Sequence, residues 1–204
     1  MNNINNSKDI EKELTRIFDR FNHHFWNDEL PSVIITFKPT KGRYGHMSSM
    51  PVWISYTEKN KYELNISAYT INRPPIEICS TLLHEQVHLY CNLHQINNCS
   101  NHGRYHNKNF KKVAEEHGLI CQPTTYYGWS KTTLSDDAIK YFKKLNIKQF
   151  AYHYIKPIPQ KGTLMRYQCP KCQKTLAWLS SEQNILCGDC KVPLVFSPIS
   201  SAAK

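Results

Sequence analysis

Residues 9–27 carry apolar side chains at the spacing of one helix face, which predicts an amphipathic helix as the first element. The residues at this spacing are Ile10, Leu14, Ile17, Phe18, Phe21, Phe25 and Trp26. Short runs rich in β-branched and aromatic residues predict strands at residues 33–37, 53–56 and 63–67. The glycines at Gly42 and Gly45 predict a turn or loop between the first two strands.

Helical spacing returns further along the chain and predicts three more helices, at about residues 76–92, 107–117 and 138–145. Pro75 suits the first turn of a helix, Gly118 suits a helix end, and Ser135 suits an N-cap. A helix, a small sheet and then further helices predict an α+β domain, which we place at residues 8–150.

The sequence also holds two Cys-x-x-Cys pairs with 14 residues between them, which are Cys169 with Cys172 and Cys187 with Cys190. Each pair forms a tight turn whose two thiolates face one metal ion, and two such pairs complete a tetrahedral Cys₄ zinc site. We therefore predict a small zinc ribbon with one structural zinc at residues 164–200, after a proline-containing linker at residues 151–163. The other cysteines show no paired spacing, and we expect buried thiols at Cys79, Cys91, Cys99 and Cys121.

The formal net charge of +10 is concentrated in one part of the chain. Residues 138–204 hold 11 Lys and Arg against 2 Asp and Glu, whereas residues 1–137 hold 15 against 14. Concentrated positive charge predicts a polyanionic partner such as DNA, and a solvated basic surface is the alternative interpretation. The candidate nucleic-acid contacts are Lys140, Lys143, Lys144, Lys148, Arg166, Lys171, Lys174 and Trp178.

The stretch LHEQVHLY at residues 83–90 carries a second candidate metal site. His84 and His88 are four residues apart, so a helix places both imidazoles on one side, where they can bind one Zn²⁺. Glu85 stands beside the first histidine and could act as a general base toward a water molecule at the metal. The apolar neighbours predict a largely buried helix, in which polar side chains need a partner.

A catalytic zinc takes three protein ligands, and several residues could supply the third. His94 follows His88 by six residues, but Cys91 stands where a sharp chain reversal would need glycine. Glu115 and Glu116 lie in a predicted helix, on a face with the character of a solvated surface.

His102 and His106 are the remaining candidates for the third ligand. His106 lies just before a predicted helix whose Phe110 is one turn further on, and a packed aromatic residue there would anchor the backbone that presents the imidazole. His102 lies beside Gly103 in a predicted loop. This reasoning favours His106 over His102 and leaves both open.

Taken together, three stretches resemble the SprT-like family of zinc metalloproteases over about residues 10–125. IFDRFNHHFWNDELPSVIITF resembles the opening helix and first strand of the family, TLLHEQVHLY its metal helix, and RYHNKNFKKVAEEHGL its third-ligand segment. In that last segment a histidine precedes an aromatic residue by four positions, and this match selects His106. Family members often have glycine directly after this histidine, where the present chain has Asn107.

The resemblance implies a zincin-like fold, with a small sheet over the helix that carries the HExxH motif. It implies zinc-dependent hydrolysis of peptide bonds, with the catalytic zinc held by His84, His88 and His106 and with Glu85 as the general base. It also implies protein substrates that are bound or crosslinked to DNA. A terminal zinc ribbon is likewise found in the family.

A different interpretation is a nucleic-acid-binding zinc-ribbon adaptor whose zincin domain is catalytically inactive. Glu85 argues against it, because a purely structural zinc site needs no carboxylate beside its ligands. The chain contains no run of 18 apolar residues, so we expect no membrane span. Residues 1–7 lack an apolar stretch of the kind found in secretory signals, so we expect a cytoplasmic protein with reduced thiols.

Overall fold

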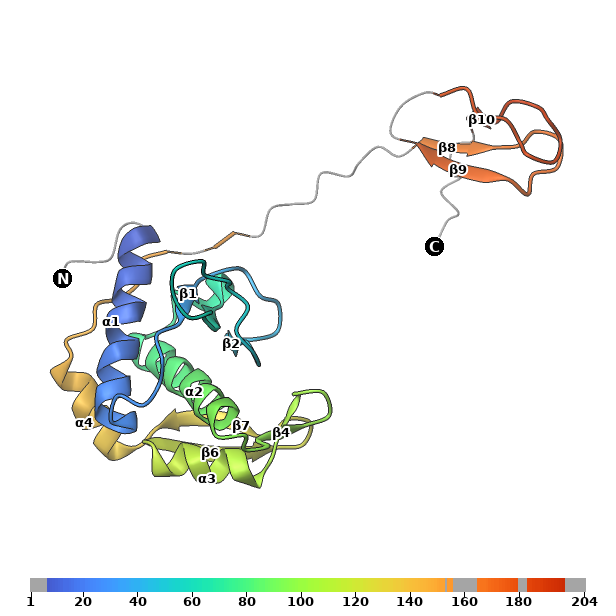
Figure 1. Cartoon of the computed structure of the whole chain (residues 1–204). Coiled ribbons are helices and arrows are strands. Elements are labelled where there is room, and N and C mark those ends of the chain that lie inside the picture. The colour runs from blue at the N-terminus through green and yellow to red at the C-terminus, as the bar shows by residue number, and fades with distance from the viewer. Residues whose placement is uncertain (1–6, 153, 156–164, 180–182, 197–204) are drawn as a thin grey trace. The chain divides into compact units, whose positions relative to one another are not determined.

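The computed structural model describes residues 7–152, 154–155, 165–179 and 183–196 (Figure 1). The chain divides into two compact units, Met1–Lys156 and Pro157–Lys204. Most of the predicted linker, including all of residues 156–163, lies outside the described residues.

The four helices predicted from the sequence are confirmed, with ends that differ by at most two residues. They are α1 (Ser7–Trp26), α2 (Pro75–Leu93), α3 (Lys108–Glu116) and α4 (Asp136–Lys144). The expected cap of the last helix is present, since the Ser135 hydroxyl accepts a hydrogen bond from the backbone N–H of Ala138 at 3.3 Å. None of the helices in the described residues has the length and apolar character needed to cross a membrane.

The first sheet contains β1 (Ile34–Thr36), β2 (Gly45–Met47) and β3 (Glu63–Ile66) in the order β1-β3-β2. The central strand β3 runs parallel to β1 and antiparallel to β2. The predicted strands at residues 33–37 and 63–67 are therefore confirmed. Strand β2 was not predicted: it begins at Gly45, where the predicted loop at residues 41–45 ends, and it forms the edge of the sheet beside α2.

The strand predicted at residues 53–56 is wrong, because only Trp53 forms a bridge there, with Lys61. The Ser55 hydroxyl accepts hydrogen bonds from the backbone N–H groups of Thr57 (3.2 Å) and Glu58 (2.8 Å). Serine side chains compete in this way with a strand ladder for backbone donors. The chain therefore forms a turn here, although the β-branched and aromatic composition of this stretch favours a strand.

A second sheet was not predicted from the sequence. It contains β4 (Cys99–Ser100), β5 (Tyr105–His106), β6 (Leu119–Thr124) and β7 (Gly128–Leu134), in the order β4-β5-β7-β6. Helix α2 lies between the two sheets, so that its opposite sides face β2 and β7 (Figure 1). A short helix η1 (Ala68–Thr70) leads from the first sheet toward α2.

Buried polar side chains tie α1 to its neighbours. The Asn22 amide donates to the carbonyl oxygen of Leu30 at 2.8 Å and accepts from its N–H at 3.0 Å. Gln86 on α2 is fully buried, accepts from Trp26 Nε1 at 3.2 Å and donates to the carbonyl oxygen of Phe18 at 3.0 Å. These bonds fix how α1 and the chain after it pack against α2.

The second unit has a three-stranded sheet of β8 (Met165–Gln168), β9 (Leu176–Leu179) and β10 (Val195–Phe196), in the order β10-β8-β9. Among the described residues of this unit, the buried core consists of Tyr167, Cys169, Cys187 and Leu194. So small a core stabilises a fold weakly on its own, which makes a bound metal ion a natural source of stability.

We expect Asn22→Ala to lower the free energy of unfolding by about 2–4 kcal/mol, because it leaves a buried N–H and a buried carbonyl of Leu30 without partners. Urea denaturation followed by circular dichroism measures the change. Lys12→Ala, on the exposed face of the same helix, is the control and should change stability by less than about 0.5 kcal/mol. Equal stability of the two variants would contradict the role given to Asn22.

Candidate metal centres

Three imidazoles converge on one point beside α2. His84 and His88 project from successive turns of that helix, and His106 projects from β5. The Nε2 atom of His106 lies 3.1 Å from that of His84 and 3.1 Å from that of His88, and the two helical Nε2 atoms are 3.3 Å apart. The three side chains form a group that could hold a metal ion.

The spacing of these nitrogens fits zinc. Imidazole nitrogens bind Zn²⁺ at about 2.0–2.1 Å, and two such ligands at tetrahedral corners lie about 3.3–3.4 Å apart. The observed Nε2 separations of 3.1–3.3 Å are close to this value. Three nitrogen ligands also leave a fourth tetrahedral position free, as a catalytic zinc site requires.

Each of the three imidazoles has a second hydrogen-bond partner that orients it. His84 Nδ1 lies 3.1 Å from the Thr132 hydroxyl, and His106 Nδ1 lies 3.3 Å from the carbonyl oxygen of Tyr127. His88 hydrogen-bonds the side chain of Asn98. An Nδ1–H that donates to an oxygen leaves the Nε2 lone pair directed at the metal position. Neither Thr132 nor Asn98 could be identified from the sequence, since neither has a recognisable spacing to the histidine motif.

Burial keeps the helical histidines uncharged. It lowers the pKa of His88 to about 3 and holds the pKa of His84 well below its usual value, and the neighbouring imidazoles add to both shifts. The pKa of His106 is lowered by burial as well. Neutral imidazoles are the form that binds a metal ion.

Glu85 lies on the neighbouring side of α2, against the edge strand β2. Its side chain is buried and accepts a hydrogen bond from the backbone N–H of Met47. Burial raises the pKa of Glu85 to about 8, although the Met47 N–H and the positive charge of Arg43 oppose the shift. A bound divalent cation would bring this raised pKa back toward that of an ordinary carboxyl group.

Gly45 makes room for this carboxylate. A Cβ at that position would lie 2.7 Å from Glu85 Oε1 and 2.8 Å from Thr81 Cγ2. Both distances are shorter than those at which Cβ atoms contact other atoms in proteins. Any side chain at residue 45 would therefore push against Glu85. The strand and the helix approach as closely as they do because residue 45 has none.

Two local features place His106. Its backbone N–H donates to the carbonyl oxygen of Tyr127 at 3.0 Å, and a Cβ on Gly128 would collide with the carbonyl oxygen of His106. Asn107, which stands where the family often has glycine, is the N-cap of α3 and accepts from the N–H groups of Asn109 and Phe110. The Phe110 ring then packs edge-on against the His106 imidazole, with ring centroids 4.5 Å apart.

The other candidates for a third ligand lie elsewhere. His102 is exposed in the β4–β5 turn, with a positive φ of 53°. His94 follows the end of α2 and pairs with Glu29 at 2.7 Å. Glu115 pairs with Lys111 at 2.6 Å, and Glu116 is exposed on α3. The structure therefore brings His106, and none of these residues, to the two helical histidines.

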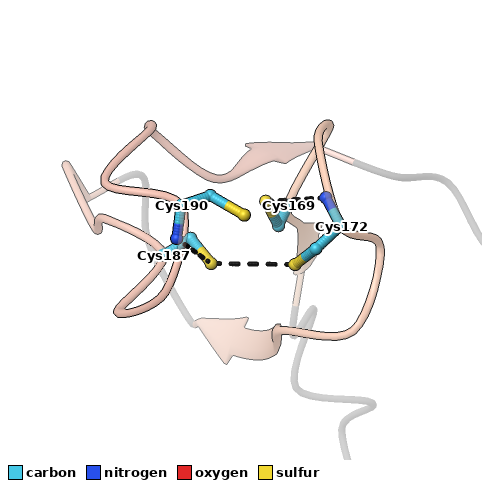
Figure 2. A group of neighbouring side chains, drawn as sticks. All are labelled: Cys169, Cys172, Cys187 and Cys190. Atoms are coloured by element: carbon cyan, nitrogen blue, oxygen red, sulfur yellow. Dashed lines mark hydrogen bonds between the residues drawn. The ribbon is translucent and has the colours of Figure 1, made fainter.

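The four cysteines of the two Cys-x-x-Cys pairs meet in the second unit, and their Sγ atoms all lie within 4.8 Å of one another (Figure 2). The Sγ atoms of Cys172 and Cys187 are 3.8 Å apart, which matches the roughly 3.8 Å expected for two thiolates at 2.3 Å from a tetrahedral zinc. The backbone N–H groups of Cys172 and Cys190 point at the Sγ atoms of Cys169 and Cys187, each at 3.4 Å.

Hydrogen-bond donors around two of these sulfurs favour thiolates, whereas burial raises the pKa of Cys190 to about 12. The backbone N–H groups of Thr175 and Lys174 lower the pKa of Cys172 to about 6. The Thr175 hydroxyl, 3.1 Å from Cys187 Sγ, lowers the pKa of that thiol. The remaining cysteines are free thiols, of which Cys79, Cys91 and Cys121 are buried and Cys99 is half-buried.

The candidate nucleic-acid contacts divide between the two units. Lys140, Lys143 and Lys144 lie on α4, and Lys148 follows that helix. Arg166 lies on β8, Lys171 and Lys174 lie in and after the first cysteine turn, and the half-exposed Trp178 lies on β9. Lys140 pairs with Asp137 at 2.8 Å, so part of its charge is locally compensated.

Comparison with known families identifies the first unit. A sequence model of the SprT-like family matches residues 14–128, which is more than half of the chain. The chain therefore belongs to the SprT-like family, which indicates a metalloprotease-type domain. The matched residues include the three convergent histidines and Glu85, whereas the four clustered cysteines lie beyond them. No curated protein and no solved structure matches the chain.

We expect the purified chain to contain about two zinc ions, one for each group. His106→Ala should remove one of them, and alanine at both Cys169 and Cys172 should remove the other. His102→Ala is the matched control and should leave both in place, because its imidazole lies in an exposed turn. Metal analysis by mass spectrometry gives the stoichiometry. Two zinc ions in His106→Ala would contradict the three-histidine site.

Proposed function

We propose that this SprT-like chain is a zinc-dependent metalloprotease of zincin-like fold, with His84, His88 and His106 as the ligands of its catalytic zinc. The observation that carries the proposal is the convergence of three imidazole nitrogens within 3.3 Å, next to a buried carboxylate. A zinc ion bound there would polarise the carbonyl of a peptide bond and lower the pKa of water.

Glu85 acts as the general base in this proposal and later as the general acid. It takes a proton from the attacking water and delivers it to the nitrogen of the leaving amine. The hydrogen bond from the Met47 N–H holds its carboxylate between the helix and the edge strand. Because Glu85 is buried, its charge is weakly screened and acts strongly on the reacting atoms.

The edge strand β2 supports a peptide as the substrate. Tyr44 and Ser48 direct backbone groups toward β3, since Ser67 N–H donates to Tyr44 O and Ser48 N–H donates to Glu63 O. Backbone groups alternate along a strand, so those of Gly45 and Met47 point away from the sheet. Because Met47 N–H donates to Glu85, an extended peptide would pair with the remaining outward groups, the N–H and carbonyl of Gly45 and the carbonyl of Met47. It would then pass Glu85, which lies against Gly45.

We further propose that the four clustered cysteines hold a structural zinc and complete a zinc ribbon. We assign to the basic C-terminal third a role in binding DNA, so that the substrates are proteins bound or crosslinked to DNA. The excess of 11 basic over 2 acidic residues in residues 138–204 supports the DNA partner. Exposed Lys171, Lys174 and Trp178 on the ribbon combine positive charge with an aromatic surface on which a base could stack.

The adaptor interpretation, in which the zincin domain is inactive, makes the opposite prediction about Glu85. We expect Glu85→Gln to reduce the rate of peptide cleavage at least about a thousandfold, because the amide cannot accept the proton from water. Zinc content and stability should stay close to those of the wild type. Cleavage of unfolded protein substrates, with and without DNA, measures the effect.

Two further variants sharpen this test. Glu116→Gln makes the same chemical change on the exposed face of α3 and should leave the cleavage rate unchanged. Gly45→Ala should lower the rate while zinc is retained, because the new methyl group presses on the Glu85 carboxylate. Absence of any cleavage by zinc-loaded wild-type protein, with or without DNA, would favour the adaptor.

For the DNA partner, we expect Trp178→Ala to weaken binding of a fluorescent single-stranded oligonucleotide by roughly 5- to 100-fold, because one stacking surface is lost. Fluorescence anisotropy titrations at two salt concentrations measure the affinity and its electrostatic part. Leu186→Ala is the control, since Leu186 is an exposed apolar residue in the same unit. Equal losses in both variants would argue against stacking on Trp178.

A further inference from the structure

A pocket lies at the start of the edge strand, outside the metal site. It has a volume of about 470 Å³ and is lined by Thr40, Lys41, Gly42, Arg43, Tyr44, Tyr69 and Thr70. These residues come from the loop before β2 and from η1. The volume is within the range of sites that hold small ligands or side chains.

Most of the pocket surface is apolar, and two of its lining residues, Lys41 and Arg43, carry positive charge. Lys41 and Arg43 are exposed, and within the described part of the chain neither side chain forms an ion pair. None of the lining residues is acidic. The nearby Arg73 is occupied, because it donates to Thr70 O and to Thr81 Oγ1, each at 3.0 Å, and lies 3.8 Å from Glu77. Two free cations on one wall fit an anionic group.

The loop that forms this wall is held at both ends. Ser67 fixes its start, because its hydroxyl donates to Thr40 O at 3.0 Å and accepts from Thr40 N–H at 3.3 Å. Ser67 N–H also donates to Tyr44 O at 2.8 Å, and the Arg73 guanidinium lies 4.1 Å from the centre of the Tyr44 ring. Gly42 turns the chain between these points with a φ of 75°. The cations are therefore presented by a loop of defined shape.

The position of the pocket relates it to the cleavage site. Arg43 precedes Gly45 by two residues, and Gly45 lies directly against Glu85. The chain bends at Tyr44, so the Cα atoms of Arg43 and Gly45 lie at most about 7 Å apart. A group bound in the pocket therefore lies two or three residues of extended peptide from the bond beside Glu85.

We propose that this pocket, with Lys41 and Arg43 as its anion-binding residues, is a specificity subsite for an acidic side chain two or three residues from the cleaved bond. The proposal rests on the proposed function, because it assigns part of the substrate of the same site. A peptide is favoured over the phosphate of a nucleic acid because the pocket ends at Tyr44, directly before the edge strand β2. A chain paired with that edge carries its own side chain into the pocket.

Pairs of internally quenched peptides test the proposal. The two members of each pair differ only by glutamate or glutamine, at each position in turn from three before to three after the cleaved bond. At one or two positions on one side of the bond, we expect the glutamate peptide to have a kcat/KM at least about tenfold higher. High salt should reduce this ratio, because both cations are exposed.

Charge variants connect the preference to the pocket. In Lys41→Gln/Arg43→Gln the ratio of glutamate to glutamine peptide should fall to about one, and in Lys41→Glu/Arg43→Glu a lysine peptide should become the better substrate. Lys59→Gln/Lys112→Gln removes the same charge at exposed positions away from the pocket and should keep the wild-type ratio. A ratio near one in the wild type, or a preference that survives in Lys41→Gln/Arg43→Gln, overturns the proposal.

Binding to the Glu85→Gln variant separates this inference from the protease function. Fluorescence anisotropy compares its affinity for labelled glutamate and glutamine peptides without any cleavage. A preference for glutamate here, with no peptide cleaved by the wild type, would support the pocket and contradict the protease. Equal affinities would overturn the pocket whether or not cleavage occurs. The pocket would instead be assigned to phosphate by two results together. The affinities for glutamate and glutamine peptides would be equal, and oligonucleotide binding would weaken in Lys41→Gln/Arg43→Gln.

Discussion

The rotational setting of α2 is the constraint on which the site depends, because consecutive residues of this one helix serve different neighbours. Successive side chains on a helix are about 100° apart. His84 and His88 therefore face His106, Glu85 faces β2, and Gln86 faces α1. A small rotation of the helix would break the Gln86 bonds and remove the carboxylate from Met47 N–H at the same time. Buried hydrogen bonds on three sides thus hold the metal ligands and the carboxylate in one arrangement.

The two candidate metal centres differ in ways that match different roles. The cysteine group offers four sulfur ligands, which fill a tetrahedral zinc, and it lies in a unit whose apolar core is small. The histidine group offers three nitrogens on a well-packed scaffold and has a buried carboxylate beside it. A closed site can only stabilise a fold, whereas a site with an open position can also bind a reactant. This contrast supports a structural role for the first group and a catalytic role for the second.

In the proposed protease, strand β2 would connect the chemistry to the substrate. On one side Gly45 and Met47 contact Glu85, and toward its start the strand continues into the cationic wall of Lys41 and Arg43. The absence of a side chain at residue 45 allows the strand to approach the helix closely. A peptide paired with the free edge would then be read by the pocket and cleaved beside Glu85. In this arrangement recognition and catalysis share one short strand.

Local sequence patterns determined the four helices, including the one that carries His84 and His88, and the two Cys-x-x-Cys pairs, because these depend on spacings within a few residues. Strand β2 and the second sheet came only from the tertiary structure, since short strands with polar or glycine residues are stable only when a neighbour pairs with them. The same is true of Thr132 and Asn98, which reach the histidines from other elements. The residues alone left His102 and His106 open, and the resemblance selected His106. Strand β5 pairs with β7 at His106 and Gly128, and this pairing brings the His106 imidazole to α2. Contacts between distant residues decide such positions, and no local spacing encodes them.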